Sequence, residues 1–247
     1  MCDTKSLDTC FLCDRPKKMI RAHILSKRFF KALKKDDKYD FYIYNNNKMG
    51  RTKSGIFDEN ILCQKCDNSF SEYENETIKL LKLDLSQYEC TIEENGHKAS
   101  FFLIPHNLIS SEKIMMFFIS LLWKSSISKR KEFSKISLGK YEKFFKEALK
   151  NRKIPDVIDV TMSYFSDNAT GKETISLPAK GRNQEGINYY EFYFNGFDIR
   201  IKVDKRKKNP FIISSLKNRD GIIILKRNNF QNSNYRKDLI RTVKKNN

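Results

Sequence analysis

The sequence predicts an α+β fold in which a metal-stapled N-terminal module, residues 1–86, precedes a larger domain, residues 87–247. Four of the six cysteines form two C-x-x-C pairs within the first module. Helical patterns then follow at 110–126 and 138–151, and after them strand-like segments dominate. Helices followed by antiparallel strands are typical of α+β proteins, so the second domain is expected to combine helices with an antiparallel sheet.

The length of 247 residues corresponds to one or two domains, and 39% hydrophobic residues are enough to bury a core. No apolar run has the roughly 18 residues that a membrane-spanning helix needs. The N-terminus has no apolar segment of the secretory type. We therefore expect a cytoplasmic protein without a membrane partner.

The formal net charge is +18, because 48 Lys and Arg residues outnumber 30 Asp and Glu residues. Such a surplus favours a polyanionic partner, most simply nucleic acid, because each phosphate contact releases a counterion. The alternative is compositional, since the chain is rich in Lys and Asn and lysine is a common solvated surface residue. Charge alone leaves both interpretations open.

The two cysteine pairs predict a structural metal site. They are Cys10-x-x-Cys13 and Cys63-x-x-Cys66. Two thiolates three positions apart can face one ion, and a tetrahedral Zn²⁺ accepts two such pairs. In a reducing compartment, cysteines are more often metal ligands or free thiols than disulfides. The alternative is that the cysteines cluster by chance or that one C-x-x-C pair has a redox role. The presence of a second C-x-x-C pair favours the zinc site over this alternative.

The segments between and after the cysteine pairs have recognisable patterns. A β-like stretch at 20–25 contains His23 and leads into a helix capped by Ser26. A hairpin is expected at 39–51, with its turn at three asparagines, and a single helix at 67–83. The N-terminal module is therefore expected to contain a strand, a hairpin and two helices around the cysteines.

The C-terminal part is dominated by strand patterns around one apolar helix. The helix at 110–126 is apolar on nearly every face, so we expect it to be buried. The segment 168–186 contains several glycines and a proline and is expected to be a mobile loop. Strands or hairpins are expected at 90–103, 157–165, 187–203 and 221–225.

The order of these features resembles the zinc-stapled branch of the HNH endonucleases, which have the ββα-metal fold. The features are a C-x-x-C pair, a strand with His23 in Ala22-His23-Ile24, the segment Asn60-Ile61-Leu62, and a C-x-x-C pair that begins a helix. The sequence segments AHILSKRFFKAL and ILCQKCDNSFSEYE are similar to segments of small bacterial and prophage HNH-like proteins. The resemblance covers residues 8–83.

The resemblance implies roles for individual residues. It assigns His23 as the general base that deprotonates the attacking water, and Asn60 as the residue that orients the His-bearing loop. It suggests Asp67 as a helix-borne ligand of a catalytic Mg²⁺ or Mn²⁺, and helical spacing adds Glu74 on the same face. The alternative for both acids is a solvated helix face.

The cations that flank the histidine complete the expected site. Arg21, Lys27 and Arg28 are expected to contact phosphates and to position the scissile bond. Two positions depart from the family pattern: Ala22 stands where an acidic ligand is usual, and the helix has Asp67 instead of histidine.

The sequence thus favours a metal-dependent endonuclease that cleaves double-stranded DNA. An activating protein partner is a further expectation. Its resemblance to prophage and defence-type proteins suggests a role in phage defence or in a mobile element. Two alternatives remain. The first is a catalytically silent zinc module that binds nucleic acid, which both departures favour. The second is a protein-interaction module in which zinc only stabilises the fold.

Overall fold

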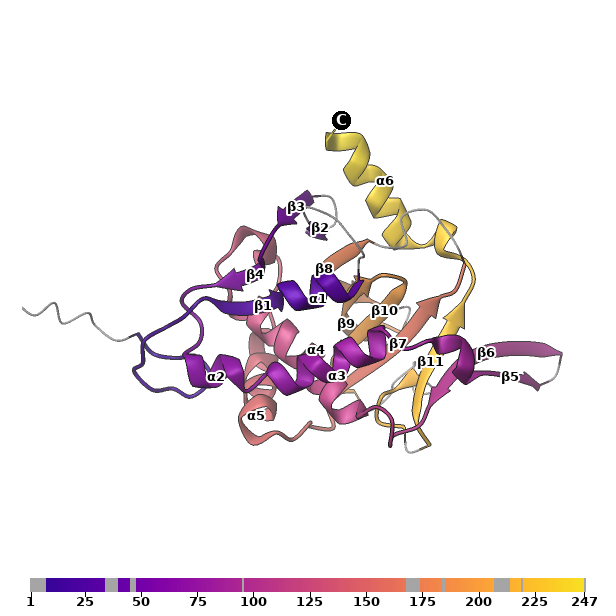
Figure 1. Cartoon of the computed structure of the whole chain (residues 1–247), viewed down its shortest axis with the longest axis horizontal. Coiled ribbons are helices and arrows are strands. Elements are labelled where there is room, and N and C mark those ends of the chain that lie inside the picture. Colours follow the sequence, from indigo (N-terminus) through magenta and orange to yellow (C-terminus); the bar gives the residue numbers. More distant parts are fainter. Residues whose placement is uncertain are drawn as a thin grey trace, which may run out of the picture.

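The computed structural model describes residues 8–33, 40–44, 48–94, 96–167, 174–183, 185–206, 214–218 and 220–246. They form an α+β fold with one large sheet, one two-stranded ribbon and helices on both sheet faces (Figure 1). The helices are α1 Lys27–Leu33, α2 Gln64–Asn68, α3 Ser71–Leu81, α4 Ser111–Ile127, α5 Glu142–Asn151 and α6 Asn234–Asn246.

The strands agree with most of the sequence-based expectations. Those of the N-terminal part are β1 Ala22–Ser26, β2 Asp40–Tyr44, β3 Lys48–Thr52 and β4 Gly55–Asp58. Those that follow are β5 Glu89–Glu94, β6 His97–Ile104, β7 Ile158–Phe165, β8 Ile175–Arg182, β9 Asn188–Phe194, β10 Phe197–Val203 and β11 Ile222–Arg227. The three expected hairpins are confirmed, although the asparagine turn at 45–47 lies outside the described residues.

β1 and α1 follow from local sequence signals, whereas β4, the partner of β1, lies in a segment for which the sequence predicted no strand. β1 pairs antiparallel with β4, so that Ala22 faces Asp58 and His23 faces Phe57. Ser26 ends the strand and caps the helix, because its Oγ accepts a hydrogen bond from the N–H of Phe29 at 3.2 Å. The ribbon therefore leads without a loop into a helix that anchors it in the core.

The large sheet has the strand order β3-β2-β8-β9-β10-β7-β11-β6-β5. Most neighbours are antiparallel, but β2 runs parallel to β8 and β11 runs parallel to β7. The sheet is therefore mixed: the expected antiparallel pairing holds for most neighbouring strands, but not for these two pairs. The parallel pair of β2 and β8 forms because the hairpin of residues 40–52 joins the edge of the large sheet. Local sequence patterns do not encode such a long-range contact.

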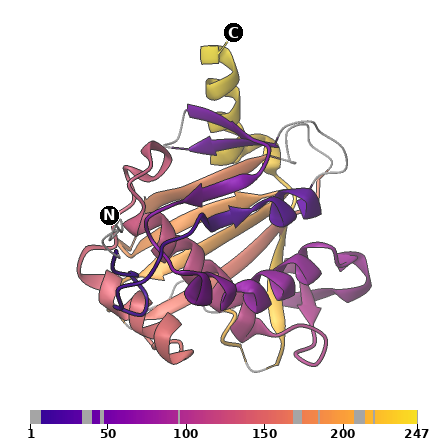
Figure 2. The ribbon, with the colours of Figure 1, turned by 60° about the vertical axis from the view of Figure 1, so that its left-hand side comes forward.

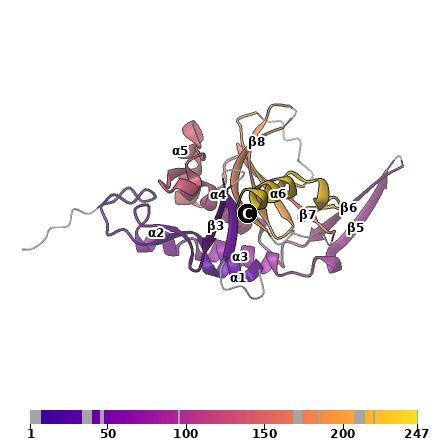
Figure 3. The same cartoon turned by 90° about the horizontal axis from the view of Figure 1, so that it is seen from above.

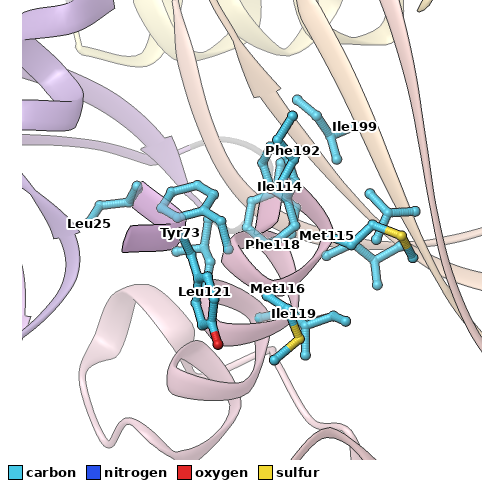
Figure 4. Close-up of a cluster of buried hydrophobic side chains, with 14 of the residues drawn as sticks. Leu25, Tyr73, Ile114, Met115, Met116, Phe118, Ile119, Leu121, Phe192 and Ile199 are labelled. Atoms are coloured by element: carbon cyan, nitrogen blue, oxygen red, sulfur yellow. The ribbon is translucent and has the colours of Figure 1, made fainter. Parts of the chain in front are cut away.

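Helix α4 is the centre of the hydrophobic core, as its all-round apolar sequence predicts. Twelve of its residues are buried, and the Phe118 ring lies 6.1 Å from the Phe194 ring of the sheet. Met115, Phe118 and Ile119 lie among residues of the sheet and of α3 in Figure 4. α4 contacts β1, α3 and α5 on its other sides. This core extends across residue 86, and the predicted domain boundary there stays a prediction.

The two faces of the sheet are covered by different helices. Phe192 and Phe194 point to α4, whereas Tyr193 between them stacks on Tyr235 of α6 with ring centroids 4.5 Å apart. Figure 2 shows helices across one face of the strands, and Figures 1 and 3 show the β5–β6 ribbon projecting from the sheet. No helix of the described residues is both long and apolar enough to cross a membrane.

Two sequence-based expectations are wrong for local reasons. The loop expected at 168–186 contains β8, which the Pro178 turn signal concealed; the pairing of β8 with β9 is irregular at this proline. The single helix expected at 67–83 is divided into α2 and α3. The Ser69 Oγ donates to the Cys66 carbonyl at 2.7 Å, and such local bonds compete with helix continuation.

Replacing Phe118 by alanine tests the central position of α4. We expect the free energy of unfolding to fall by about 3–5 kcal/mol, because a fully buried aromatic ring leaves a cavity. Urea denaturation followed by circular dichroism measures it. The matched control is Ile92→Ala on β5, a residue that is 54% exposed, for which we expect a change within about 0.5 kcal/mol. Equal effects of the two substitutions would contradict this assignment of the core.

Candidate metal centre and adjoining polar site

Four cysteines meet at one end of the β1–β4 ribbon. The sulfur atoms of Cys10, Cys13, Cys63 and Cys66 all lie within 4.8 Å of one another. A tetrahedral zinc with Zn–S bonds of about 2.3 Å brings its sulfurs to roughly 3.8 Å separation, so small adjustments suffice to fit the ion. The cluster predicted from the sequence is thereby confirmed as a site that can hold a metal ion such as zinc.

Backbone hydrogen bonds hold the two halves of this cluster together. In the first turn, the Asp14 N–H donates to the Cys10 carbonyl at 2.9 Å, and Asp14 has a positive φ of 56°. The second pair begins α2, with Cys63 as its N-cap. The Phe11 N–H donates to the Ile61 carbonyl at 3.1 Å. These bonds assemble the ligand set from segments that lie far apart in the sequence.

The surroundings of the thiols favour metal binding. Burial opposes ionisation of Cys10, but backbone N–H groups, including that of Cys63 at 3.4 Å from its sulfur, outweigh this and lower its pKa to about 7. Burial raises the pKa of Cys66 well above its usual value, with the neighbouring thiols adding to the rise. A cation that draws all four thiols into the thiolate form therefore releases protons when it binds.

A cluster of polar side chains lies next to the cysteine cluster, around Asp67 of α2. We call it the His23 cluster and define it by His23, Ser26, Asp67, Glu74 and Lys124. The Asp67 carboxyl interacts with the backbone N–H and the ring of His23, although burial raises its pKa overall. Ser26 Oγ donates to the Glu74 carboxylate. The structure thus brings together His23, Asp67 and Glu74 as the sequence predicts.

Lys124 is the member of this cluster that sequence reasoning missed. It lies on α4, only 5% exposed, and its Nζ donates to the His23 carbonyl at 2.7 Å. The ammonium also lies over the Phe70 ring, 4.9 Å from the centroid. Burial lowers the pKa of Lys124, whereas the charges of Asp67 and Glu74 oppose the shift. The sequence signal that could have identified Lys124 is its position directly after the apolar run of residues 114–123.

Asp58 is a second residue that the sequence analysis did not single out. It lies opposite Ala22 on the ribbon and is 8% exposed. Its Oδ2 accepts a hydrogen bond from Ser128 Oγ at 2.7 Å, and its Oδ1 accepts one from the Asn60 N–H at 3.1 Å. Asn60 itself is exposed, and its backbone N–H is the group that the structure ties to Asp58.

The predicted phosphate-contacting cations all lie on the surface near β1. Lys27 and Arg28 are exposed at the start of α1. The Arg21 guanidinium lies over the Phe57 ring, 3.4 Å from its centroid, and 4.0 Å from the Glu59 carboxylate. The ring and the ion pair fix the direction of Arg21, whereas Lys27 and Arg28 point into solvent without an ion pair among the described residues.

Several cation clusters of the C-terminal part are engaged in ion pairs. Lys226 pairs with Glu89 at 2.5 Å, Arg227 with Asp198 at 2.9 Å, and Arg206 with Asp204 at 2.6 Å. Lys207 and Lys208 lie outside the described residues. These pairs reduce the charge that the C-terminal part presents to a polyanion.

Comparisons with protein-family models, with curated proteins and with solved structures found no match to this chain.

Replacing Cys63 by serine tests the metal centre. We expect loss of bound metal and of the folded N-terminal part, because structural zinc contributes roughly 10–16 kcal/mol to such modules. Metal content by atomic emission and thermal melting measure the two effects. Cys90→Ser, on β5 outside the cluster, is the control and should retain both. Retained metal and unchanged melting of Cys63→Ser would overturn the assignment.

Lys124 gives a pH-dependent expectation. The pKa of Lys124 is lowered in the folded state. Between this folded-state pKa and 10.5, the unfolded chain therefore binds more protons at Lys124 than the folded chain does. Stability from this group is therefore fully present above pH 10.5 and is lost as the pH falls through the folded-state pKa. We expect the stability of the native protein, relative to Lys124→Met, to rise as the pH increases towards 10.5 in urea titrations. A pH-independent difference would exclude a depressed pKa.

Proposed function

We propose that this protein is a metal-dependent endonuclease of the HNH type that hydrolyses phosphodiester bonds in double-stranded DNA, with zinc in the cysteine cluster. The observation that carries the proposal is the His23 cluster: a histidine on the first strand of an antiparallel ribbon, beside an acidic residue on the helix that follows the second strand. This is the order of elements that the HNH resemblance implies.

His23 is the proposed general base. Lys124 Nζ donates to its carbonyl at 2.7 Å, and the Asp67 carboxyl lies close enough to its N–H and ring for both to oppose the rise of the Asp67 pKa. The side chain is half-buried, so water has access to the ring. A positioned imidazole that takes a proton from attacking water contributes typically 10²- to 10⁴-fold to the rate.

Asp67 and Glu74 are the residues that would hold a catalytic Mg²⁺ or Mn²⁺. Their carboxylate oxygens are the ligands that hard divalent cations prefer. When bound, such an ion would stabilise the negative charge that develops on the phosphate. Asp58 provides a carboxylate opposite Ala22, the position where the family pattern expects an acid. Since both Asp58 oxygens accept hydrogen bonds, we assign it a positioning role for the ribbon.

One observation favours a second candidate function, a catalytically silent module that binds nucleic acid. The Lys124 ammonium already supplies a buried positive charge to Asp67 and Glu74, where the nuclease requires a metal ion. In the silent module this lysine would replace the ion, and the cations near β1 would retain phosphate binding. A role in phage defence or in a mobile element, like an activating partner, rests on the resemblance alone.

Plasmid nicking with purified protein in Mg²⁺ or Mn²⁺, against EDTA, tests the nuclease. We expect metal-dependent cutting that falls by about 10²- to 10⁴-fold in His23→Ala, because the base is removed. The matched control is His97→Ala at the start of β6, an exposed histidine outside the cluster, which should cut normally.

The outcomes separate the two candidates. Comparable cutting by His23→Ala would show that His23 is not the base. Absence of cutting by the native protein, with metal bound in the cysteine cluster and DNA retained, would favour the silent module.

A further inference from the structure

A pocket of about 700 Å³ opens beside the cysteine cluster, and we call it the knuckle pocket. Leu12 and Leu149 contribute apolar side chains to it, and Cys13, Cys63 and Cys66 adjoin it from the cluster. It joins the first cysteine turn and α2 to the C-terminal end of α5. Segments of the chain that lie more than 80 positions apart therefore form one concave surface.

The charged lining of the knuckle pocket is entirely basic. None of the described residues that line it is acidic. Its cations are Arg15, Lys17, Lys18, Lys65, Lys150 and Arg152.

Four of these cations have no ion pair among the described residues. Lys150 pairs with Asp14 at 3.2 Å and Arg152 with Glu72 at 3.1 Å. The other four, from the first cysteine turn and α2, are exposed and unpaired; they are Arg15, Lys17, Lys18 and Lys65. The C-terminal clusters at Lys226, Arg227 and Arg206 differ, because acidic neighbours neutralise them.

The cysteine cluster does not account for all of this charge. Four thiolates around one Zn²⁺ carry a net charge of −2, which offsets two of the four unpaired cations. Two positive charges remain at the mouth of a concave site that contains no acidic side chain. Such a site attracts an anionic ligand, and its apolar floor suits a ligand with flat or aliphatic groups between its charges.

We propose that the knuckle pocket binds the phosphodiester backbone of the DNA strand whose scissile bond lies at His23. This inference rests on the proposed nuclease function and names how its substrate is held. Gln64, Lys65 and Ser69 of the α2 segment line the pocket, while Asp67 of the same helix adjoins His23. Since a helix is roughly 10–12 Å across, about three nucleotides at 3.4 Å rise connect the two sites.

The test is binding of a fluorescein-labelled DNA duplex of about 20 base pairs, measured by anisotropy at several salt concentrations. The protein carries His23→Ala and the buffer contains no added Mg²⁺ or Mn²⁺ and no chelator, so that cleavage does not interfere and metal in the cysteine cluster is retained. The pocket variant is Lys17→Gln, Lys18→Gln and Lys65→Gln together. The control variant removes three exposed lysines outside the pocket and consists of Lys48→Gln, Lys82→Gln and Lys135→Gln.

We expect the pocket variant to bind DNA at least tenfold more weakly than the control variant at 0.15 M salt. We also expect the slope of log K against log[salt] to be shallower by about 2.7, which is about 0.9 for each of three lost phosphate contacts. Equal affinities and slopes of the two variants would overturn the proposal. Metal content and melting temperature verify that each variant is folded. If the triple pocket variant loses metal, Lys65→Gln alone, against Lys48→Gln, gives the same comparison with a slope change of about 0.9.

The binding result is independent of the proposed catalysis. Pocket-dependent binding without nicking by the native protein would support the knuckle pocket and reject the nuclease. Nicking that is lost in His23→Ala, together with binding that is insensitive to the pocket substitutions, would support the nuclease and reject the pocket.

Discussion

The closure of two distant C-x-x-C pairs on one metal site is the constraint on which the N-terminal architecture depends. It joins ends separated by 49 residues, between Cys13 and Cys63. Loop-closure entropy for such a segment costs about 3.5 kcal/mol, plus a constant. A zinc site contributes roughly 10–16 kcal/mol, which exceeds this cost. An ion held by the four cysteines would therefore fix where β1 and α2 meet, and with them His23 and Asp67.

Buried polar contacts then connect this module to the rest of the molecule. Lys124 of α4 donates to the His23 carbonyl, and Ser128, just after α4, donates to Asp58 of β4. Both strands of the ribbon are thus tied to the same central helix. A buried ammonium without acceptors costs several kcal/mol, so the geometry around Lys124 is restricted to arrangements that keep the His23 carbonyl in place. The position of the His23 cluster is a property of the whole core.

The distribution of charge follows from the same architecture. In the C-terminal part, side chains on the outer sheet face pair with one another, as Asp198 does with Arg227 and with the Tyr235 hydroxyl at 2.6 Å. Around the first cysteine turn and at the start of α1, cations such as Arg15 and Lys27 are exposed and have no ion pair within the part of the chain that the structure describes. The net charge of +18 therefore includes cations that acidic neighbours pair as well as cations that stay available to a polyanion.

The sequence by itself determined the features that short-range chemistry controls. Cysteine spacing identified all four members of the cysteine cluster, strand patterns identified three hairpins, and all-round apolarity identified α4 as buried. Only the tertiary structure decided the rest: the docking of the β2–β3 hairpin on β8, the strand concealed around Pro178, and the contacts of Asp58 and Lys124. Those two contacts join residues 70 and 101 positions apart. No local propensity reaches that far, because such contacts depend on how the core packs.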